Sequence, residues 1–396
     1  MIKEVKKEAP PPKKKPNPLI RLLAFLLTLA LILGAIFLVV NRDSLNFDAL
    51  KRWFTYRSLA RSDSGSGEPF AYQGGSSLSL HACGGDLLAV SETGVRLYSP
   101  GGTAYVEDTL PMENPVCQVS GNAAVVYDAA GSTLRVYKDR AQVFALSDTG
   151  ATILSARLNQ NGYLAVVTRS SGYKGVVSVY DANYKPLMSL KLSSVYILDA
   201  VVSPDNRSLL AVTADQENRF FNSTLAQYSL SDSGSEPPTP TAAWSLGNRL
   251  PLDLIWDETG VRVVTQSAAL AADGALNQSG EYNWSERYLK RYSLLADDRF
   301  AVLTSPYRSG SQTTLEMVDM SGQVTASLDE TRPILSISAA GKYIGVLTSQ
   351  ELNIYTRDLE LYATLENSSN ATRLVMLADG SAFLATQDTA WLYLPN

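Results

Sequence analysis

The chain has 396 residues, of which 45% are hydrophobic and 18% charged, and this composition excludes global disorder. A net charge of −5 argues against a nucleic-acid-binding protein with a broad basic face. One histidine, His81, and two cysteines, Cys83 and Cys117, are too few for a zinc site of the Cys₂His₂ or Cys₄ type.

The N-terminal segment, residues 1–21, is basic. It carries seven basic and two acidic side chains and five prolines, whereas the other 375 residues carry 27 basic and 37 acidic groups. Such a polar, proline-rich stretch cannot bury apolar surface, so we expect a disordered tail.

Residues 22–40 form an uncharged apolar run in which Thr28 is the only clearly polar side chain. As a helix this run spans roughly 28 Å, close to the thickness of a bilayer core, and predicts one transmembrane helix. A cleaved signal peptide is the alternative, but its apolar region should be shorter and end in small residues, whereas this run ends in Phe37–Asn41. We therefore expect an uncleaved signal anchor in the cell membrane. The basic tail places the N-terminus in the cytoplasm and the C-terminal domain outside it.

Residues 41–68 are predicted to form a stalk made of a helix and a linker. Phe47, Leu50, Trp53 and Phe54 recur at roughly helical spacing, between basic residues. This pattern fits an interfacial amphipathic helix, or equally a short helix that packs on the following domain. Ser62–Gly67 is typical of a flexible linker.

Residues 69–396 are repetitive. Eight segments rich in Ala and Val each follow a Gly or Asp/Asn turn, at positions 85, 121, 162, 206, 260, 298, 341 and 380. The spacings run from 36 to 54 residues with a mean of about 42, the period of a four-stranded propeller blade. We predict an all-β fold, a β-propeller of eight blades. Seven blades remain the alternative, because the second half of the fifth unit (residues 251–284) is irregular.

The last unit has only 16 residues after Gly380 and supplies three strands, ending in Trp391–Leu394. The missing strand can come from Pro69–Tyr72 at the start of the domain. Pairing the two ends of the chain would close the ring and remove two exposed sheet edges.

The sequence carries no recognised catalytic or metal-binding motif. It has no G-x-S-x-G elbow, H-E-x-x-H pair, phosphate-binding loop or calcium loop. His81 lies on the first strand of the first unit, and we interpret it as a structural or surface residue. We therefore assign no catalytic, cofactor-binding or metal-ligating residue and predict no enzyme activity.

Cys83 and Cys117 lie on the first strands of adjacent units. An extracytoplasmic location permits a disulfide between them. A bridge requires Cα atoms within about 7 Å, which neighbouring strands need not satisfy. Two small buried thiols are the other interpretation.

Two further pairs are candidate functional residues. Asp199 and Asp253 begin equivalent strands in LDAVVS and LDLIWD, which makes them candidates to face a central channel. A shared structural turn would also explain their equivalence. Tyr307 and Arg308 lie in a longer turn of the sixth unit and are candidate partner contacts, or parts of an ordinary loop.

The arrangement of basic tail, anchor, stalk and repeats resembles a family of unknown function, formed by single-pass, membrane-anchored β-propeller proteins of Gram-positive bacteria. The segments that carry the resemblance are Arg287–Leu294, Arg299–Leu303 and Pro306–Gly310. The resemblance implies a membrane-tethered propeller and no known activity. Units such as GGDLLAVSETGVRLYSPGG are distantly similar to quinoprotein-like propeller repeats and to an outer-membrane assembly scaffold. The tryptophan docking pattern of those repeats is missing, so no cofactor is carried over.

These observations favour a non-enzymatic binding or scaffold protein at the cell envelope. Its expected partners are the membrane, through the single span, and other envelope proteins or a cell-wall component, with no nucleic acid. The alternative is an enzyme that binds a ligand or cofactor in the central channel. Many functions share one fold, so the fold does not decide between the two.

Overall fold

The computed structural model describes residues 18–40, 47–75, 77–147, 150–217, 220–231, 239–284 and 286–395. The predicted tail up to residue 17 and residues 41–46 of the predicted stalk lie outside these residues. The chain divides into two compact units, Met1–Thr55 and Tyr56–Asn396.

The first unit contains helix α1 (Pro18–Val40) and most of helix α2 (Phe47–Tyr56). Helix α1 begins four residues before the predicted apolar run, and proline suits the first position of a helix because its missing N–H has no intrahelical partner there. Side-chain exposure in α1 is described for residues 22–34 and 36, and all of these are exposed. Among the described residues, no helix is both long enough and apolar enough to cross a membrane.

The second unit is an eight-bladed β-propeller, in which each blade is a sheet of four antiparallel strands. Blades 1 and 2 consist of β2 (Ser79–Cys83), β3 (Asp86–Ser91), β4 (Gly94–Tyr98) and β5 (Ala104–Thr109), then β6 (Pro115–Ser120), β7 (Ala123–Asp128), β8 (Leu134–Lys138) and β9 (Ala141–Leu146). Blades 3 and 4 consist of β10 (Thr152–Leu158), β11 (Leu164–Arg169), β12 (Gly175–Tyr180) and β13 (Pro186–Leu192), then β14 (Tyr196–Val202), β15 (Ser208–Glu217), β16 (Phe220–Ser229) and β17 (Ala242–Gly247).

Blades 5 and 6 consist of β18 (Pro251–Asp257), β19 (Gly260–Thr265), β20 (Ala268–Ala272) and β21 (Gln278–Asn283), then β22 (Tyr288–Ala296), β23 (Arg299–Ser305), β24 (Thr313–Val318) and β25 (Val324–Glu330). Blade 7 consists of β26 (Ile334–Ala340), β27 (Tyr343–Thr348), β28 (Glu351–Thr356) and β29 (Leu361–Glu366). Blade 8 combines β30 (Arg373–Met376), β31 (Ala382–Ala385) and β32 (Thr389–Tyr393) with β1 (Phe70–Ala71) from the start of the unit.

The core lies between neighbouring blades. The second strands are covered on both faces, so β3 (DLLAVS) and β19 (GVRVVT) are buried along their whole length. The fourth strands alternate between exposed and partly buried residues, as in β5 and β25. Burial decreases from the second to the fourth strand because sheets stack on each other. A strand that is covered on both faces must be apolar throughout. The first strands of most successive blades contact one another, as β10 contacts β14 and β22 contacts β26.

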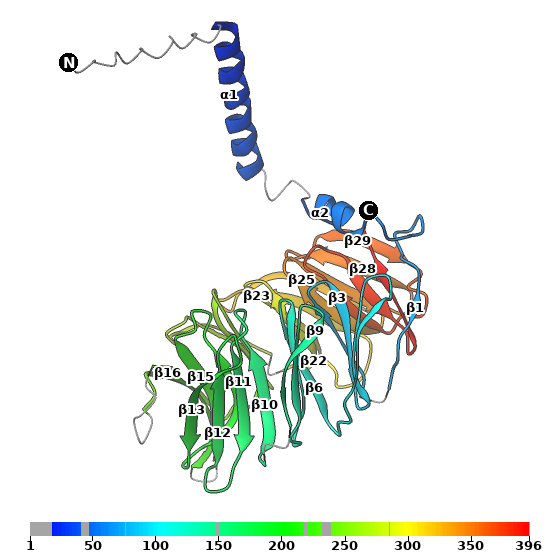
Figure 1. Ribbon diagram of the computed structural model, residues 1–396. Helices are drawn as coiled ribbons and strands as arrows, with labels where there is room; N and C mark the ends of the chain where they lie inside the picture. Colours follow the sequence, from blue (N-terminus) through cyan, green and yellow to red (C-terminus); the bar gives the residue numbers. More distant parts are fainter. Residues whose placement is uncertain are drawn as a thin grey trace, which may run out of the picture. The chain divides into compact units, whose positions relative to one another are not determined.

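The pairing of the chain ends confirms the predicted closure. Phe70 pairs with Ala390 and Ala71 with Thr389, so β1 completes the sheet formed by the last three strands. Figure 1 shows β1, in blue, beside the red strands of the chain end. The fifth unit, predicted to be irregular, forms a complete sheet, and the number of blades is eight rather than seven.

The predicted flexible linker is ordered instead. Arg61 bridges to Gly67, and Ser66 bridges to Tyr393 on β32. The Leu394 amide donates to the Gly65 carbonyl at 2.9 Å, and the Gly67 amide donates to the Leu392 carbonyl at 2.8 Å. The prediction was wrong because a segment rich in serine and glycine is flexible only when its backbone has nothing to pair with. Here the edge of the last strand has unpaired backbone groups, and the segment forms hydrogen bonds with them.

The connections define two opposite faces of the ring, since each strand runs antiparallel to its neighbours. On the turn face, connections join first to second strands and third to fourth strands, and most of them are short. On the crossover face, loops join second to third strands, and longer segments lead from one blade to the next. On the turn face, backbone and side-chain hydrogen bonds join neighbouring blades, for example from the Gly84 amide to the Gly121 carbonyl and from Asn159 Nδ2 to the Ser203 carbonyl.

The segment that contains Gly65 should be highly sensitive to substitution. Gly65 has φ of +85°, and a Cβ atom there would lie 2.3 Å from the Leu394 carbonyl oxygen. Gly162 has φ of +83° and open space around the same position. We expect Gly162→Ala to cost about 1 kcal/mol, and Gly65→Ala at least about 2 kcal/mol, because it adds steric overlap to backbone strain. Denaturant unfolding measures the loss of stability in both variants. Equal losses would contradict the close contact between Gly65 and Leu394.

Candidate functional site

A β-bulge recurs in the innermost strands of blades 3 to 7. The register shifts by one residue at the same place in each of the five first strands. A bulge inserts one residue and re-aims the side chains that follow it. The residues immediately after the five bulges are Ser155, Asp199, Asp253, Arg291 and Ser336.

Arg157 joins three of these innermost strands. Its Nε atom lies 2.6 Å from Oδ2 of Asp199 in blade 4, and its Nη2 atom lies 2.8 Å from Oδ1 of Asp253 in blade 5. Its Nη1 atom donates to the Leu254 carbonyl at 2.9 Å. Three donors of one guanidinium therefore connect blades 3, 4 and 5 across the inner side of the ring.

The two carboxylates have further partners from their own surroundings. Asp199 accepts a hydrogen bond from the Ser155 hydroxyl and another from the Ala200 amide. Asp253 accepts one from the Leu254 amide at 2.8 Å. The Asp199 side chain is 18% exposed and that of Asp253 is 35% exposed, so Asp253 is the more accessible of the two.

Burial and the charges of Asp199 and Asp253 change the pKa values of three neighbouring groups, Arg157, Tyr127 and Tyr292. Burial alone would lower the pKa of Arg157, but Asp199 and Asp253 outweigh it and raise that pKa above its ordinary value. Burial and then the charge of Asp199 raise the pKa of Tyr127 to about 12. Burial and then the charge of Asp253 raise the pKa of Tyr292 to about 12. Near neutral pH the Arg157 guanidinium is therefore charged and the phenols of Tyr127 and Tyr292 are neutral.

The structure brings the predicted pair Asp199 and Asp253 together through Arg157 on the inner strands. Ser155 and Arg157 were not predicted from the sequence. A sequence signal existed for Ser155. Leu followed by a polar residue recurs in ILSARL, ILDAVV and PLDLIW, and in each strand this dipeptide marks the bulge. Recognising Arg157 also requires knowing that three separate blades meet.

His81 lies on β2, with Nε2 3.1 Å from the Ser79 hydroxyl. Burial lowers the pKa of His81 to about 4, so the ring is neutral at physiological pH. Within the described part of the chain, no group of three or more His, Cys, Asp or Glu side chains is placed to hold a metal ion.

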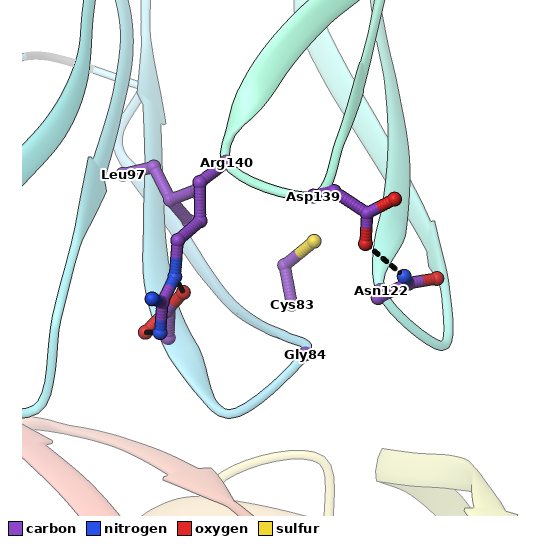
Figure 2. Close-up of a pocket in the computed structure, with 7 residues that line it drawn as sticks. Cys83, Gly84, Leu97, Asn122, Asp139 and Arg140 are labelled. Carbon is purple, nitrogen blue, oxygen red and sulfur yellow. Dashed lines mark hydrogen bonds and ion pairs between the residues drawn. The ribbon is translucent and has the colours of Figure 1, made fainter.

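A pocket of about 430 Å³ opens between blades 1 and 2 on the turn face. The polar side chains that line it pair with one another, and Figure 2 shows the contact between Asn122 and Asp139. Arg140 binds Asp86 through two contacts, Nε to Oδ2 at 2.7 Å and Nη2 to Oδ1 at 3.1 Å. Asn122 Nδ2 donates to Asp139 at 2.5 Å. These contacts join the three turns that surround the pocket.

Both cysteines are free thiols, so the disulfide hypothesis is not supported. Cys83 reaches the pocket between blades 1 and 2, and both cysteines belong to one apolar cluster with Leu88 and Val126. Burial raises the pKa of Cys83 to about 12 and that of Cys117 further. The neighbouring strands bring the two side chains into one cluster, where each behaves as a small apolar residue.

Exposed aromatic side chains gather on the crossover face. Among the described residues of the propeller, six aromatic side chains are strongly exposed, and five of them lie at this end of blades 3, 4 and 6: Tyr173, Tyr196, Phe221, Tyr288 and Tyr307. Leu250 and Leu252, at the crossover from blade 4 to blade 5, are also exposed. The sixth aromatic residue, Tyr105, lies on an outermost strand under the guanidinium of Arg140.

The predicted contact residues Tyr307 and Arg308 lie on this face. They belong to the loop between β23 and β24, where Tyr307 is 61% exposed. The Arg308 side chain is exposed, and its carbonyl accepts a hydrogen bond from Lys290 Nζ at 2.6 Å. This places both residues in an exposed loop that is anchored to β22.

Comparison with protein families gives a partial match. Residues 71–241 match a family of unknown function, DUF5711, and this agrees with the resemblance to a family without known activity. No curated protein is significantly similar to the chain.

Solved structures with the same fold are distant in sequence. The C-terminal WD40 domain of Sif2 is 16% identical, with a TM-score of 0.53 over 84% of this chain and 93% of that chain. The dihydro-heme d1 dehydrogenase NirN is 14% identical, with a TM-score of 0.51 over 75% of this chain and 67% of that chain. BamB from Moraxella catarrhalis is 14% identical, with a TM-score of 0.48 over 83% of this chain and 96% of that chain. At these identities the likeness to Sif2 and NirN shows the propeller fold alone.

Arg157 should be a major stabilising residue. Arg157→Met leaves two carboxylates close together without their cation, and we expect a loss of about 3 kcal/mol in the free energy of unfolding. The triple variant with Asp199→Asn and Asp253→Asn should recover at least half of that loss, because it removes the unpaired charges as well. Denaturant unfolding compares the variants. If the Arg157→Met variant were as stable as the original protein, Arg157 would not have this stabilising role.

The thiols should be present but protected. We expect thiol titration of the denatured, non-reduced protein to yield two free groups. In the native protein both should react much more slowly, because Cys83 is 5% exposed and its pKa is about 12. A denatured sample without free thiols would show that the cysteines are bridged.

Proposed function

We propose that this protein is a non-enzymatic scaffold of the cell envelope, which binds partner proteins through the crossover face of blades 3 to 6. The observation that carries the proposal is the gathering of five exposed aromatic side chains on that face. Exposed tyrosine and phenylalanine side chains form the energetic centres of many protein interfaces, since they bury a large area at a small entropy cost.

The rest of the ring supports a binding role rather than catalysis. On the inner strands, Arg157 already pairs with Asp199 and Asp253, which gives both carboxylates a structural function. On the turn face, hydrogen bonds between turns tie neighbouring blades together. A rigid ring of this kind presents its loops in fixed positions and lowers the entropy cost of binding.

The proposed location rests on the sequence. Residues 22–40 carry no charge and follow a basic segment, as a signal anchor with a cytoplasmic N-terminus requires. The described side chains in this segment are exposed, and most of them are large and apolar. In this proposal a single span holds the propeller outside the cytoplasm at the membrane surface.

The alternative function is binding of a ligand or cofactor in the central channel, with catalysis there. The 35% exposure of Asp253 favours it, since one carboxylate remains accessible beside the neutral Tyr292. If this alternative holds, Asp253→Asn should abolish ligand binding, whereas scaffold function should survive the substitution.

Position-specific photo-crosslinking in living cells tests the scaffold role. A photoreactive residue at Tyr196 or Tyr307 should capture partner proteins, whereas the same residue at Lys185 or Arg207, exposed on the turn face, should not. Tyr288→Ala combined with Tyr307→Ala should weaken capture at Tyr196 at least tenfold if these rings anchor the same partner. Equal capture from both faces, or capture from the turn face alone, would contradict the proposal.

A further inference from the structure

Five residues of blade 6 lie at the crossover end of β22 and in the neighbouring loop between β23 and β24. We call them the blade-6 patch: Tyr288, Lys290, Arg291, Tyr307 and Arg308. Tyr288 pairs in register with Ser305, which immediately precedes the loop that carries Tyr307 and Arg308. Lys290 Nζ donates to the Arg308 carbonyl at 2.6 Å and so fastens the loop to β22. Tyr288 is 48% and Tyr307 61% exposed.

The three cations of the patch differ from neighbouring cations in their partners. Arg249 pairs with Glu281, Arg287 with Glu316, and Arg332 with both Glu330 and Glu351. Among the described residues, none of the three patch cations pairs with a carboxylate. In the part of the chain that the structure describes, Lys290 donates to the Arg308 carbonyl and Arg291 to the Leu335 carbonyl. The exposed Glu286 is the nearest acidic residue in the sequence.

The charge of the patch is opposite to that of the chain as a whole, whose net charge is −5. Like-signed charges that gather without partners repel one another, so a ligand that supplies negative charge relieves this repulsion. The two exposed rings add apolar area that a purely ionic ligand would leave unused. An apolar ligand would instead cover three cations without pairing them, which costs free energy.

We propose that the blade-6 patch binds an acidic protein segment that carries aromatic or aliphatic side chains among its carboxylates. The proposal rests on the scaffold function and names the chemistry of its partner. Carboxylates pair with Arg291, Arg308 and Lys290, and the guanidinium groups can hold them through two parallel hydrogen bonds. The apolar side chains of the segment pack on Tyr288 and Tyr307. Arg291 follows the bulge in β22, at the position that Asp199 and Asp253 hold in their blades, so the patch begins on a first strand of the ring.

Binding of a defined acidic polymer tests the chemistry directly. The full-length protein in detergent is titrated with a random copolymer of glutamate and tyrosine, with polyglutamate and with inorganic polyphosphate. We expect the copolymer to bind most tightly, and its binding to weaken as salt is raised. Lys290→Glu combined with Arg308→Glu should reduce copolymer affinity about tenfold or more, which corresponds to about 1.4 kcal/mol.

The matched control reverses two charges on the turn face, Lys185→Glu combined with Arg207→Glu. Both side chains are exposed, and no described ion pair involves either of them. The control has the same net charge as the patch variant, so an effect of total charge would appear equally in both. Arg308→Glu alone is a second test variant, because the Arg308 side chain makes no described contact that folding could depend on. Tyr288→Ala with Tyr307→Ala should weaken binding of the copolymer but not of polyglutamate.

Three results would overturn the proposal. The first is equal binding of polyphosphate and the copolymer with the same loss in the patch variant, which would show a general polyanion site. The second is an equal loss in the patch variant and in the turn-face control. The third is unchanged copolymer binding in both patch variants.

Crosslinking separates this proposal from the scaffold function. If Tyr196 still captures a partner in the Lys290→Glu and Arg308→Glu variant, the crossover face binds proteins but not through an acidic segment at the patch. If no crossover-face position captures a protein, the scaffold function itself fails, whatever the polymers show.

Discussion

The pairing of β1 with β32 is the contact on which the propeller depends. Only two residues of the first strand, Phe70 and Ala71, form register pairs, yet they complete the last sheet and join the chain ends. Without them the outer edge of β32 would be open, and a free sheet edge invites pairing with other chains. The hydrogen bond from the Leu394 amide to the Gly65 carbonyl extends the same closure beyond the sheet.

Closure also fixes what the inner strands and loops can do. In blades 3 to 5 a bulge at the same position turns side chains of three first strands toward one another. The guanidinium of Arg157 in blade 3 therefore pairs with Asp199 in blade 4 and with Asp253 in blade 5. The same rigidity holds the loops of the crossover face in place. Exposed rings there can then serve as preformed contacts, without an ordering cost for each partner.

Much of the fold could be predicted because local chemistry repeats with every blade. The turns that marked the units need a left-handed backbone, and Gly85 and Asn206 show it with φ of +90° and +60°. The site was less accessible to sequence reasoning. Asp199 and Asp253 stood out by their equivalent positions, but Arg157 has no repeated counterpart in the other blades. The order of Ser62–Gly67 escaped prediction because its partner strand lies over 300 residues away in the sequence.

The central claim is that the crossover face of blades 3 to 6 is the binding surface. Hydrogen–deuterium exchange measures it most directly, by comparing the protein in an extract of its own cells with the purified protein. We predict slower amide exchange in the extract within residues 169–174, 248–252, 286–291 and 306–312, with no change in the turns of the opposite face. Protection confined to the turn face or to the inner strands would contradict it.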